Sequence, residues 1–182
     1  MRPPTDQGAA ALAYARRGWA VLPCHDPTAG GCSCAIRDCA SPAKHPRTRR
    51  GLHDATTELR TVKRWWRRWP DANVGLRTGA ASGLVVLDVD PAHGGEASLA
   101  ELVDAYEALP ATLEVRTGGG RHLYFAHPGV RVANSAGGLG PGLDVRGDGG
   151  YILAPPSRHA SGATYRRLTP GPPAALPGWL QA

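Results

Sequence analysis

The sequence of 182 residues lacks any long apolar run. A membrane-spanning helix needs roughly 20 consecutive apolar residues, and no stretch of the chain approaches that length. Asp6, Arg16 and Arg17 interrupt the first 24 residues, which excludes the continuous apolar core of a secretory signal peptide. We therefore expect a cytoplasmic protein with no membrane partner.

Lysine is nearly absent, because only Lys44 and Lys63 occur among 21 basic residues. Nearly all the positive charge is therefore guanidinium, which pairs with phosphate through two parallel hydrogen bonds. The formal net charge is +6 and the pI is about 9.5, which favours nucleic acid or a nucleotide over a basic substrate. Ordinary soluble proteins also carry such a charge, so composition alone leaves both interpretations open.

Cysteine is scarce and confined to one segment, residues 23–51, which also has almost no apolar periodicity. A loop of this length without regular structure needs a further stabilising interaction to hold it in place. In the cytoplasm its four cysteines are more typical of metal ligands or free thiols than of disulfides.

The spacing within this segment is Cys32-x-Cys34-x4-Cys39-x5-His45. Three thiolates and one imidazole are the donor set of a closed, structural Zn²⁺ site. The gap between Cys32 and Cys34 is tighter than the usual spacing, so Cys24 or His25 stays open as an alternative ligand. Unligated thiols are the other interpretation of the same residues.

The rest of the chain alternates between helical and strand patterns, without an internal repeat. Thr5 and Gly18 are suited to cap a first helix, and Pro70 stops a second. Helices are expected at 6–17, 61–69 and 98–109, and strands at 19–22, 73–76, 84–87, 113–116, 122–125, 142–146 and 151–154. This order predicts an α/β (α+β) fold, a mixed sheet with flanking helices, in a single domain over residues 1–182.

The segment 63–69, KRWWRRW, combines tryptophans with cations and supports two interpretations. Such a segment can bind a nucleic-acid strand by stacking and phosphate contacts. On a helix, however, Trp65, Trp66 and Trp69 group on one face, as in an amphipathic helix that packs by its tryptophans. We favour the packed helix.

The segment LVVLDVD places two carboxylates at the end of an apolar strand, which we expect to be central in its sheet. Side chains of a strand alternate between faces, so Asp88 and Asp90 project to the same side. An all-carboxylate site selects Mg²⁺ or Mn²⁺ over Zn²⁺, and such ions take their other ligands from water and substrate phosphates. The alternative is that the pair caps a turn before Pro91.

A third acid, Asp144, lies between the apolar residues Leu143 and Val145 on another expected strand. If these two face the core, Asp144 faces the other side, where it can join the metal site. Without that site it is an ordinary solvent-facing strand residue. The nearby Asp148, in Gly-Asp-Gly-Gly, is better explained as a turn residue.

A glycine loop joins the strands at 113–116 and 122–125, which we expect to form a hairpin. The loop consists of Thr117, Gly118, Gly119, Gly120 and Arg121, and His122 follows it. Its backbone amides can approach phosphate oxygens, and Arg121 or His122 can neutralise their charge. The loop therefore predicts a nucleotide-binding site for a triphosphate, with a flexible turn as the alternative.

Three segments in this order, LDVDP, TGGGRHLYF and GLDVRGDGGYILAPPS, resemble the three motifs of the archaeo-eukaryotic primase superfamily. The match is to its bifunctional DNA primase/polymerase branch, found in plasmids, phages and other mobile elements. It extends to the framing segments PAKHP, WWRRWPDANVGLRTG and LPGWL, and so covers nearly the whole chain.

The resemblance implies that Asp88 and Asp90 are the first two ligands of a two-metal Mg²⁺ or Mn²⁺ site and that Asp144 is the third. His122 would contact the triphosphate of the incoming nucleotide. Gly120 stands where the family usually has a serine. The implied fold is an RRM-like catalytic core joined to an N-terminal α/β unit, with residues 23–51 as a zinc-binding insertion.

The implied activity is template-directed transfer of nucleotides from NTPs or dNTPs to a 3′-hydroxyl, on a single-stranded DNA template with a primer strand. Two alternatives remain at this point. One is a non-catalytic, zinc-stabilised nucleic-acid-binding module, and the other is a different metal-dependent phosphoryl enzyme such as a nuclease. The sequence also leaves open whether the chain is one domain of a longer protein with a helicase module.

Overall fold

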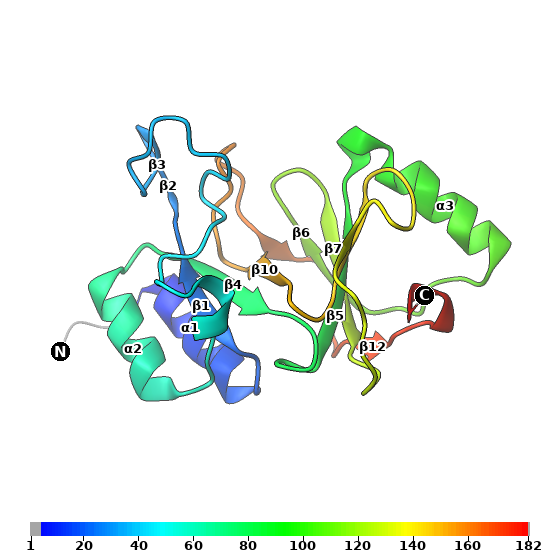
Figure 1. The fold of residues 1–182 in the computed structure, drawn as a ribbon, viewed down its shortest axis with the longest axis horizontal. Coiled ribbons are helices and arrows are strands. Elements are labelled where there is room, and N and C mark those ends of the chain that lie inside the picture. Colours follow the sequence, from blue (N-terminus) through cyan, green and yellow to red (C-terminus); the bar gives the residue numbers. More distant parts are fainter. Residues whose placement is uncertain (1–4, 182) are drawn as a thin grey trace. The chain divides into compact units, whose positions relative to one another are not determined.

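The computed structural model describes residues 5–181 and shows a mixed α+β protein with three α-helices in that range. The chain divides into two compact units. Unit 1 comprises the chain up to Arg77 together with Tyr151–Arg166, and unit 2 comprises Thr78–Gly150 and the chain from Arg167 on. Figure 1 shows the elements of both units. No helix within residues 5–181 has the length and apolar character to cross a membrane.

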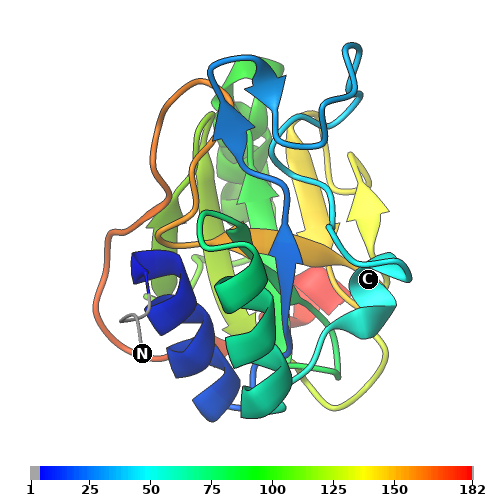
Figure 2. The same ribbon diagram turned by 90° about the vertical axis from the view of Figure 1, so that its left-hand side faces the viewer.

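Unit 1 contains two helices and a three-stranded antiparallel sheet in the order β1-β4-β10. The helices are α1 (Asp6–Arg16) and α2 (Leu59–Arg68), and the strands are β1 (Val21–Cys24), β4 (Asn73–Arg77) and β10 (Tyr151–Ala154). Helices α1 and α2 lie side by side, as Figure 2 shows. They approach closely because Gly8 leaves room for Trp66.

Side chains cap both helices of unit 1 at their N-termini. The hydroxyl of Thr5 accepts a hydrogen bond from Gly8 N, as the sequence predicts. The carboxylate of Glu58 accepts from the N–H groups of Arg60 and Thr61, so α2 begins two residues before the expected position. A cap satisfies backbone donors that have no partner within the helix.

The cysteine-rich segment is a long loop of unit 1 with little regular structure. It holds the short hairpin β2 (Pro27–Thr28) and β3 (Gly31–Cys32), and the 3-10 helix η1 (Gly51–Asp54) follows it. The fully buried Asn73 anchors the segment by donating to the carbonyl oxygens of His25 (3.3 Å) and Ala43 (2.9 Å). The hydroxyl of Tyr151 donates to Lys44 O.

Unit 2 is built on a sheet in the order β11-β6-β7-β5-β9-β8, with β12 added beside β7. These strands are β5 (Leu84–Val89), β6 (Leu113–Arg116), β7 (Arg121–Ala126), β8 (Ser135–Ala136), β9 (Leu143–Arg146), β11 (Arg166–Arg167) and β12 (Ala174–Ala175). Strand β5 has a partner on each side, so its central position is confirmed. Strands β6 and β7 form the expected hairpin.

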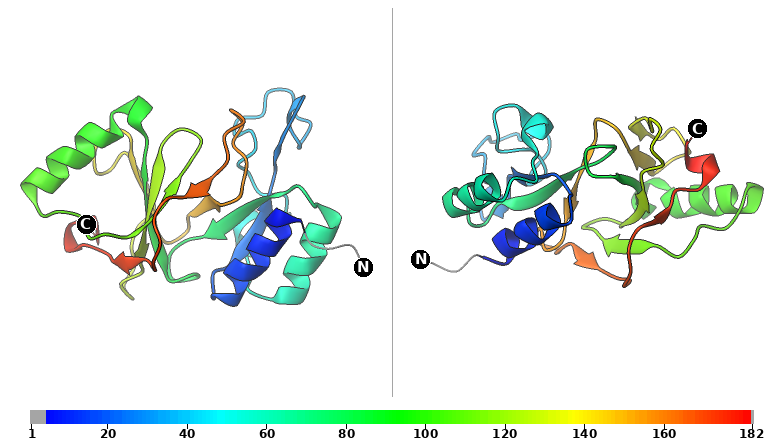
Figure 3. Two further views of the ribbon diagram at one scale, coloured as in Figure 1. Left: turned by 180° about the vertical axis from the view of Figure 1, so that it is seen from behind. Right: turned by 90° about the horizontal axis from the view of Figure 1, so that it is seen from below.

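The main hydrophobic cluster of unit 2 lies on one face of this sheet. It includes Val85, Leu87 and Val89 from β5, Leu123 and Phe125 from β7, and Leu143 and Val145 from β9. Helix α3 (Gly95–Ala105) contributes Leu99 and contacts β5 and β9. Figure 3 shows α3 and the sheet from two further sides, and the 3-10 helices are η2 (Pro91–His93) and η3 (Gly178–Gln181).

One strand and two helices differ from the sequence prediction in ways that have a structural reason. The strand expected at 19–22 lies two residues later, at Val21–Cys24, because these are the residues that pair with β4. The helix expected at 61–69 is Leu59–Arg68. The helix expected at 98–109 is Gly95–Ala105, and Tyr106 beyond its end is 65% exposed, so the apolar spacing there does not continue the helix.

The prediction that α2 packs by its tryptophans is confirmed for Trp66 and holds in part for the other two. Trp66 is buried, and its indole N–H donates to Ala72 O at 3.1 Å. Trp65 and Trp69 are only partly buried. The reason is geometric, since the side of α2 that faces α1 and β1 is filled by Val62 and Trp66.

Candidate active site and metal centre

The pairing register of unit 2 brings Asp88, His122 and Asp144 into one row across three neighbouring strands. Asp88 on β5 lies directly opposite His122 on β7 and directly opposite Asp144 on β9. Directly opposed residues of antiparallel strands point to the same face, with Cβ atoms roughly 5 Å apart. The sheet therefore gathers residues that are up to 56 positions apart in the sequence.

Alternation along the strands turns this row away from the apolar core. The flanking residues Leu87, Val89, Leu143 and Val145 all belong to the core cluster. Asp88 and Asp144 therefore project from the opposite face, as the alternation argument predicts for Asp144. Their side chains are 30% and 29% exposed, so both carboxylates remain accessible to a dissolved cation.

Asp88 and Asp144 each have a cationic or ionisable neighbour on the same face of the sheet. The carboxylate of Asp88 lies 3.4 Å from Nε2 of the buried His122. The carboxylate of Asp144 accepts from the Arg146 guanidinium at 2.6 Å and from Gly137 N at 2.9 Å. Arg146 was missed as a site residue, although its position two residues after Asp144 places it on the same face.

Asp90 lies just beyond the end of β5. Its carboxylate accepts from Ala92 N at 3.0 Å and contacts His93 Nδ1 at 2.8 Å, and so caps the 3-10 helix η2. The side chain is 42% exposed. The turn-capping role weighed in the sequence analysis is thus present in the structure, and a carboxylate with free lone pairs can combine it with metal binding.

The donor set of this face suits a hard divalent cation. Two like charges directly opposite each other on neighbouring strands destabilise a sheet, and a bound cation removes that cost. All oxygens come from carboxylates, which is the chemistry that Mg²⁺ and Mn²⁺ prefer. The aspartates do not form a closed cluster, since within residues 5–181 ligand atoms within 4.8 Å of one another are found for the cysteine segment alone.

The glycine loop is held by contacts within unit 2. Thr117 Oγ1 accepts from the N–H groups of Gly119 and Gly120. The Arg121 guanidinium pairs with Glu96 through two contacts of 2.8 Å and with Glu114 at 3.3 Å. The hydrogen bond to Arg121 lowers the pKa of Glu96 below its usual value. The charge of Arg121 is therefore balanced by two carboxylates, which sequence spacing does not reveal.

Gly120 is required by the close approach of its backbone to β5. A Cβ atom at this position would lie 2.0 Å from Val89 O and 2.8 Å from Cδ of Pro91. This contact explains why the usual serine of the family motif does not fit in this chain. Because Val89 lies between Asp88 and Asp90, the same contact fixes the backbone that carries the two carboxylates.

We predict that Gly120→Ala destabilises the protein by roughly 3 kcal/mol, because overpacking against a fixed backbone carbonyl forces a shift of β5. Gly119→Ala is the matched control, since nothing lies within 4 Å of a Cβ atom there. Thermal unfolding of both variants measures the effect, and about 5–12 °C separates their Tm values if the clash is real. Equal Tm values for the two variants would show that the loop yields.

Asp148 has a structural role, in agreement with its assignment to a turn. Its carboxylate accepts from Ala80 N at 2.9 Å and Val132 N at 3.0 Å, and it lies 3.1 Å from His127 Nε2. Burial alone would raise the pKa of Asp148, but these hydrogen bonds and His127 outweigh it and lower the pKa to about 2. Asp148 therefore joins two loops and lies outside the row.

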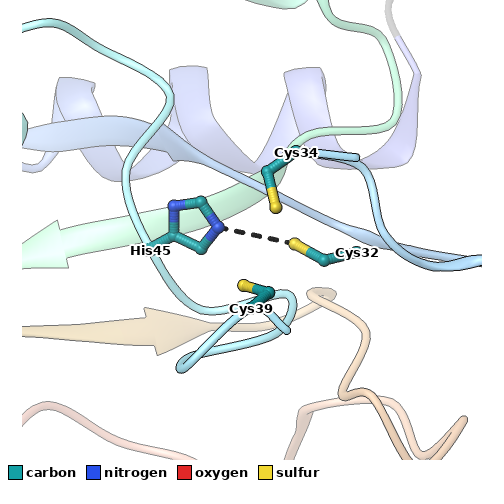
Figure 4. Close-up of side chains that lie close together, drawn as sticks. All are labelled: Cys32, Cys34, Cys39 and His45. Carbon is teal, nitrogen blue, oxygen red and sulfur yellow. Dashed lines mark hydrogen bonds between the residues drawn. The ribbon is translucent and has the colours of Figure 1, made fainter. Parts of the chain in front are cut away.

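The cysteine-rich segment of unit 1 contains a second, separate group of ligand-type side chains. The ligand atoms of Cys32, Cys34, Cys39 and His45 all lie within 4.8 Å of one another. Figure 4 shows the four side chains converging, with His45 Nε2 3.5 Å from Cys32 Sγ. Three thiols and one imidazole suit tetrahedral Zn²⁺, so the structure brings together the set that the spacing predicts.

The surroundings of this cluster favour a thiolate at Cys32. Burial would raise the pKa of this thiol, but hydrogen bonds from Ala43 N and from Cys34 and His45 lower it to about 7. A backbone N–H from Ile36 also donates to Cys34 Sγ. Such N–H donors stabilise negative sulfur and orient metal ligands.

Cys24 and His25 are not members of the cluster, so the structure favours the Cys32, Cys34, Cys39 and His45 set over the alternative that the sequence leaves open. Cys24 is fully buried on β1, and burial raises the pKa of its thiol far above the usual value. Burial, Arg47 and His45 lower the pKa of His25 to about 4. His25 stacks on His45, with ring centroids 4.3 Å apart, and so supports a cluster residue.

The fold and these two groups of residues define a class of protein. It is a mixed α+β protein with aspartates in a row on an antiparallel sheet and a Cys/His cluster that suits zinc. The chain belongs to the bifunctional DNA primase/polymerase N-terminal family, whose model matches residues 11–179. A search of the curated proteins found no match to the chain. Membership implies DNA and nucleotides as substrates and a nucleotidyltransferase activity.

Proposed function

We propose that this chain is a template-directed DNA primase/polymerase domain that extends a 3′-hydroxyl with nucleotides through a two-metal site. The observation that carries the proposal is the register that sets Asp88 between His122 and Asp144 on one face of the sheet, with both carboxylates partly exposed. The third motif of the family supplies Asp144, which a simple binding module does not need. The family context further favours replication of a plasmid, phage or other mobile element.

In this proposal Asp88, Asp90 and Asp144 hold Mg²⁺ or Mn²⁺. The bound ions would supply a more acidic 3′-hydroxyl and neutralise the charge that develops on the phosphates. The 3′-oxygen forms a bond to the α-phosphorus while the bond to the departing pyrophosphate breaks, and the hydroxyl proton passes to solvent. His122, fixed against Asp88 by burial, would orient the triphosphate from the adjacent strand.

The glycine loop has a narrower role in this scheme than the sequence suggests. Its amides at Gly119 and Gly120 donate to Thr117, and Arg121 pairs with Glu96 and Glu114. We propose that the loop binds the triphosphate through Gly118 and the backbone around it, while Arg121, paired with Glu96 and Glu114, holds the loop in place. A loop that is already held in place needs little reorganisation during the reaction.

Primer extension tests the proposal. The protein is incubated with a labelled primer on a single-stranded DNA template, NTPs or dNTPs, and Mg²⁺ or Mn²⁺. Longer products that depend on metal and template support it. An unprimed template in a parallel reaction tests initiation separately.

The alternatives predict other outcomes in the same assay. Shortening of the labelled strand without added nucleotides identifies a nuclease. Binding of the strand without any incorporation, unaffected by changes at Asp88 and Asp90, identifies a non-catalytic binding module. Either result would overturn the proposed polymerase.

A further inference from the structure

Unit 1 contains a hollow of about 540 Å³ that has no part in the proposed catalysis. The loop before η1 and one side of α2 line it. Its most prominent side chains are five arginines, Arg47, Arg49, Arg50, Arg64 and Arg68. Two tryptophans, Trp65 and Trp69, complete the wall.

The positive charge of the hollow is only partly compensated by carboxylates. Asp26 pairs with Arg47, and Asp54 pairs with Arg50 at 2.8 Å. Within the described range, residues 5–181, no carboxylate lies at ion-pair distance from Arg49, Arg64 or Arg68. These three side chains therefore provide unbalanced positive charge at the rim of one cavity.

The arginines of α2 form a row that folding does not require. Arg60, Arg64 and Arg68 follow one another at four-residue spacing, and all three are exposed. Like charges at this spacing destabilise a helix by a few tenths of a kcal/mol per pair. The row advances by about 6 Å per arginine along the helix axis, so it presents successive charges to an extended polyanion rather than one charge to a small ion.

The two tryptophans of the hollow are not fully buried in the core. Trp66 fills the core position of this helix, whereas Trp65 and Trp69 remain partly exposed. The guanidinium carbons of Arg68 and Arg47 lie 5.2 Å and 5.8 Å from the ring centroid of Trp69. Aromatic rings among cations are the surface on which single-stranded nucleic acids bind, by base stacking and phosphate pairing.

We infer that this hollow binds a segment of single-stranded nucleic acid, with phosphates on Arg49, Arg64 and Arg68 and a base stacked on Trp65. The inference rests on the proposed function, since it supplies a binding surface for the strand on which that enzyme acts. The site is separate from the carboxylates and needs neither metal nor nucleoside triphosphate. A free nucleotide offers the same chemistry, but the row on α2 favours a strand with several phosphates.

Binding of a fluorescein-labelled oligothymidylate, followed by fluorescence anisotropy without metal or nucleotides, tests the phosphate contacts. Arg64→Ala with Arg68→Ala should weaken binding at least about tenfold at low salt. The negative slope of log K against log salt should become shallower by about 1.4, for the loss of two phosphate contacts. Arg16→Ala with Arg37→Ala is the matched control, because it removes two exposed guanidinium groups of unit 1 outside the hollow. Equal losses in the two double variants would overturn the inference.

Stacking is tested at Trp65. Trp65→Ala should weaken binding about 5- to 100-fold with the salt slope unchanged, and Trp65→Phe should recover most of the affinity because it retains an aromatic face. Circular dichroism and Tm of each variant verify folding. No change in affinity for Trp65→Ala in a folded protein contradicts the stacked base.

Two further arms keep this inference distinct from the catalytic proposal. Asp88→Asn should bind the oligonucleotide as the unmodified protein does, whether or not the protein extends primers. Titration with dTTP in place of the oligonucleotide shows whether the hollow binds a free nucleotide or a strand. Competition by dTTP at the affinity of the oligonucleotide would overturn the assignment to a strand.

Discussion

Asp88→Asn is expected to reduce nucleotide incorporation by at least about a thousandfold while the protein remains folded. The substitution keeps the shape of the side chain and removes its charge, which a divalent cation requires. Loss of roughly 4 kcal/mol of transition-state stabilisation corresponds to a factor of about 10³, and metal ions contribute several kcal/mol to such reactions. Primer-extension rates under single-turnover conditions, with Mg²⁺ and with Mn²⁺, measure the effect.

The matched control for this variant is Asp104→Asn. Asp104 is an exposed acid on α3, which packs against the core face of the sheet rather than the face that carries Asp88. Its removal changes the net charge of the protein by the same amount. We expect its extension rate to stay within about twofold of the unmodified protein, as for a surface position away from the reaction.

Asp144→Asn tests the third member of the proposed site independently. A loss comparable to that of Asp88→Asn supports the three-carboxylate assignment. Because Asp144 also pairs with Arg146, Arg146→Ala separates the effect of charge at Asp144 from the loss of its orientation. Full activity of a folded Asp144→Asn protein would exclude Asp144 as a metal ligand, even if Asp88 proves essential.

The row of Asp88, His122 and Asp144 illustrates what the sequence reveals about the site and what it does not. Alternation within one strand predicts which side Asp144 faces, and the structure confirms that prediction. The register between strands depends on the pairing of β5 with β7 and β9, which are separated from it by long connections. No local pattern encodes that register, so the sequence offers His122 and Asp144 as candidates without showing that both lie opposite Asp88.

The same distinction explains the errors and omissions. The Cys/His cluster was predicted because its spacing is local, within one loop. The partners of Arg121, Glu96 and Glu114, come from other elements and were not predicted. Helical periodicity correctly grouped the tryptophans of α2 but could not show that only Trp66 among them would be fully covered. A neighbouring element decides how much of an apolar face is covered.

Removal of zinc is expected to unfold the tip of the cysteine-rich segment, the part that carries the cluster from Cys32 to His45, while the rest of unit 1 stays folded. We propose that the purified protein holds one Zn²⁺ per chain on Cys32, Cys34, Cys39 and His45. Few side chains of this segment are buried, so metal ligation replaces a core there. The base of the segment has other anchors, namely Asn73 on Ala43 and Tyr151 on Lys44, which limit the unfolding to the tip.

Limited trypsin digestion after chelation measures this local unfolding, because the exposed Arg37 lies within the tip. Structural zinc contributes roughly 10–16 kcal/mol in small domains, and loss of even about 3 kcal/mol raises the open fraction about a hundredfold. Cleavage at Arg37 should accelerate accordingly.

A pair of substitutions separates a zinc ligand from a buried thiol of the same segment. Cys39→Ser should lose the metal and become sensitive to trypsin without chelation, whereas Cys24→Ala should keep one Zn²⁺ and stay resistant. Both variants remove one thiol, but only Cys39 belongs to the cluster, since Cys24 is buried on β1. Zinc content by mass spectrometry and the rate of cleavage at Arg37 must change together, because the ligation that binds the ion is what holds the tip.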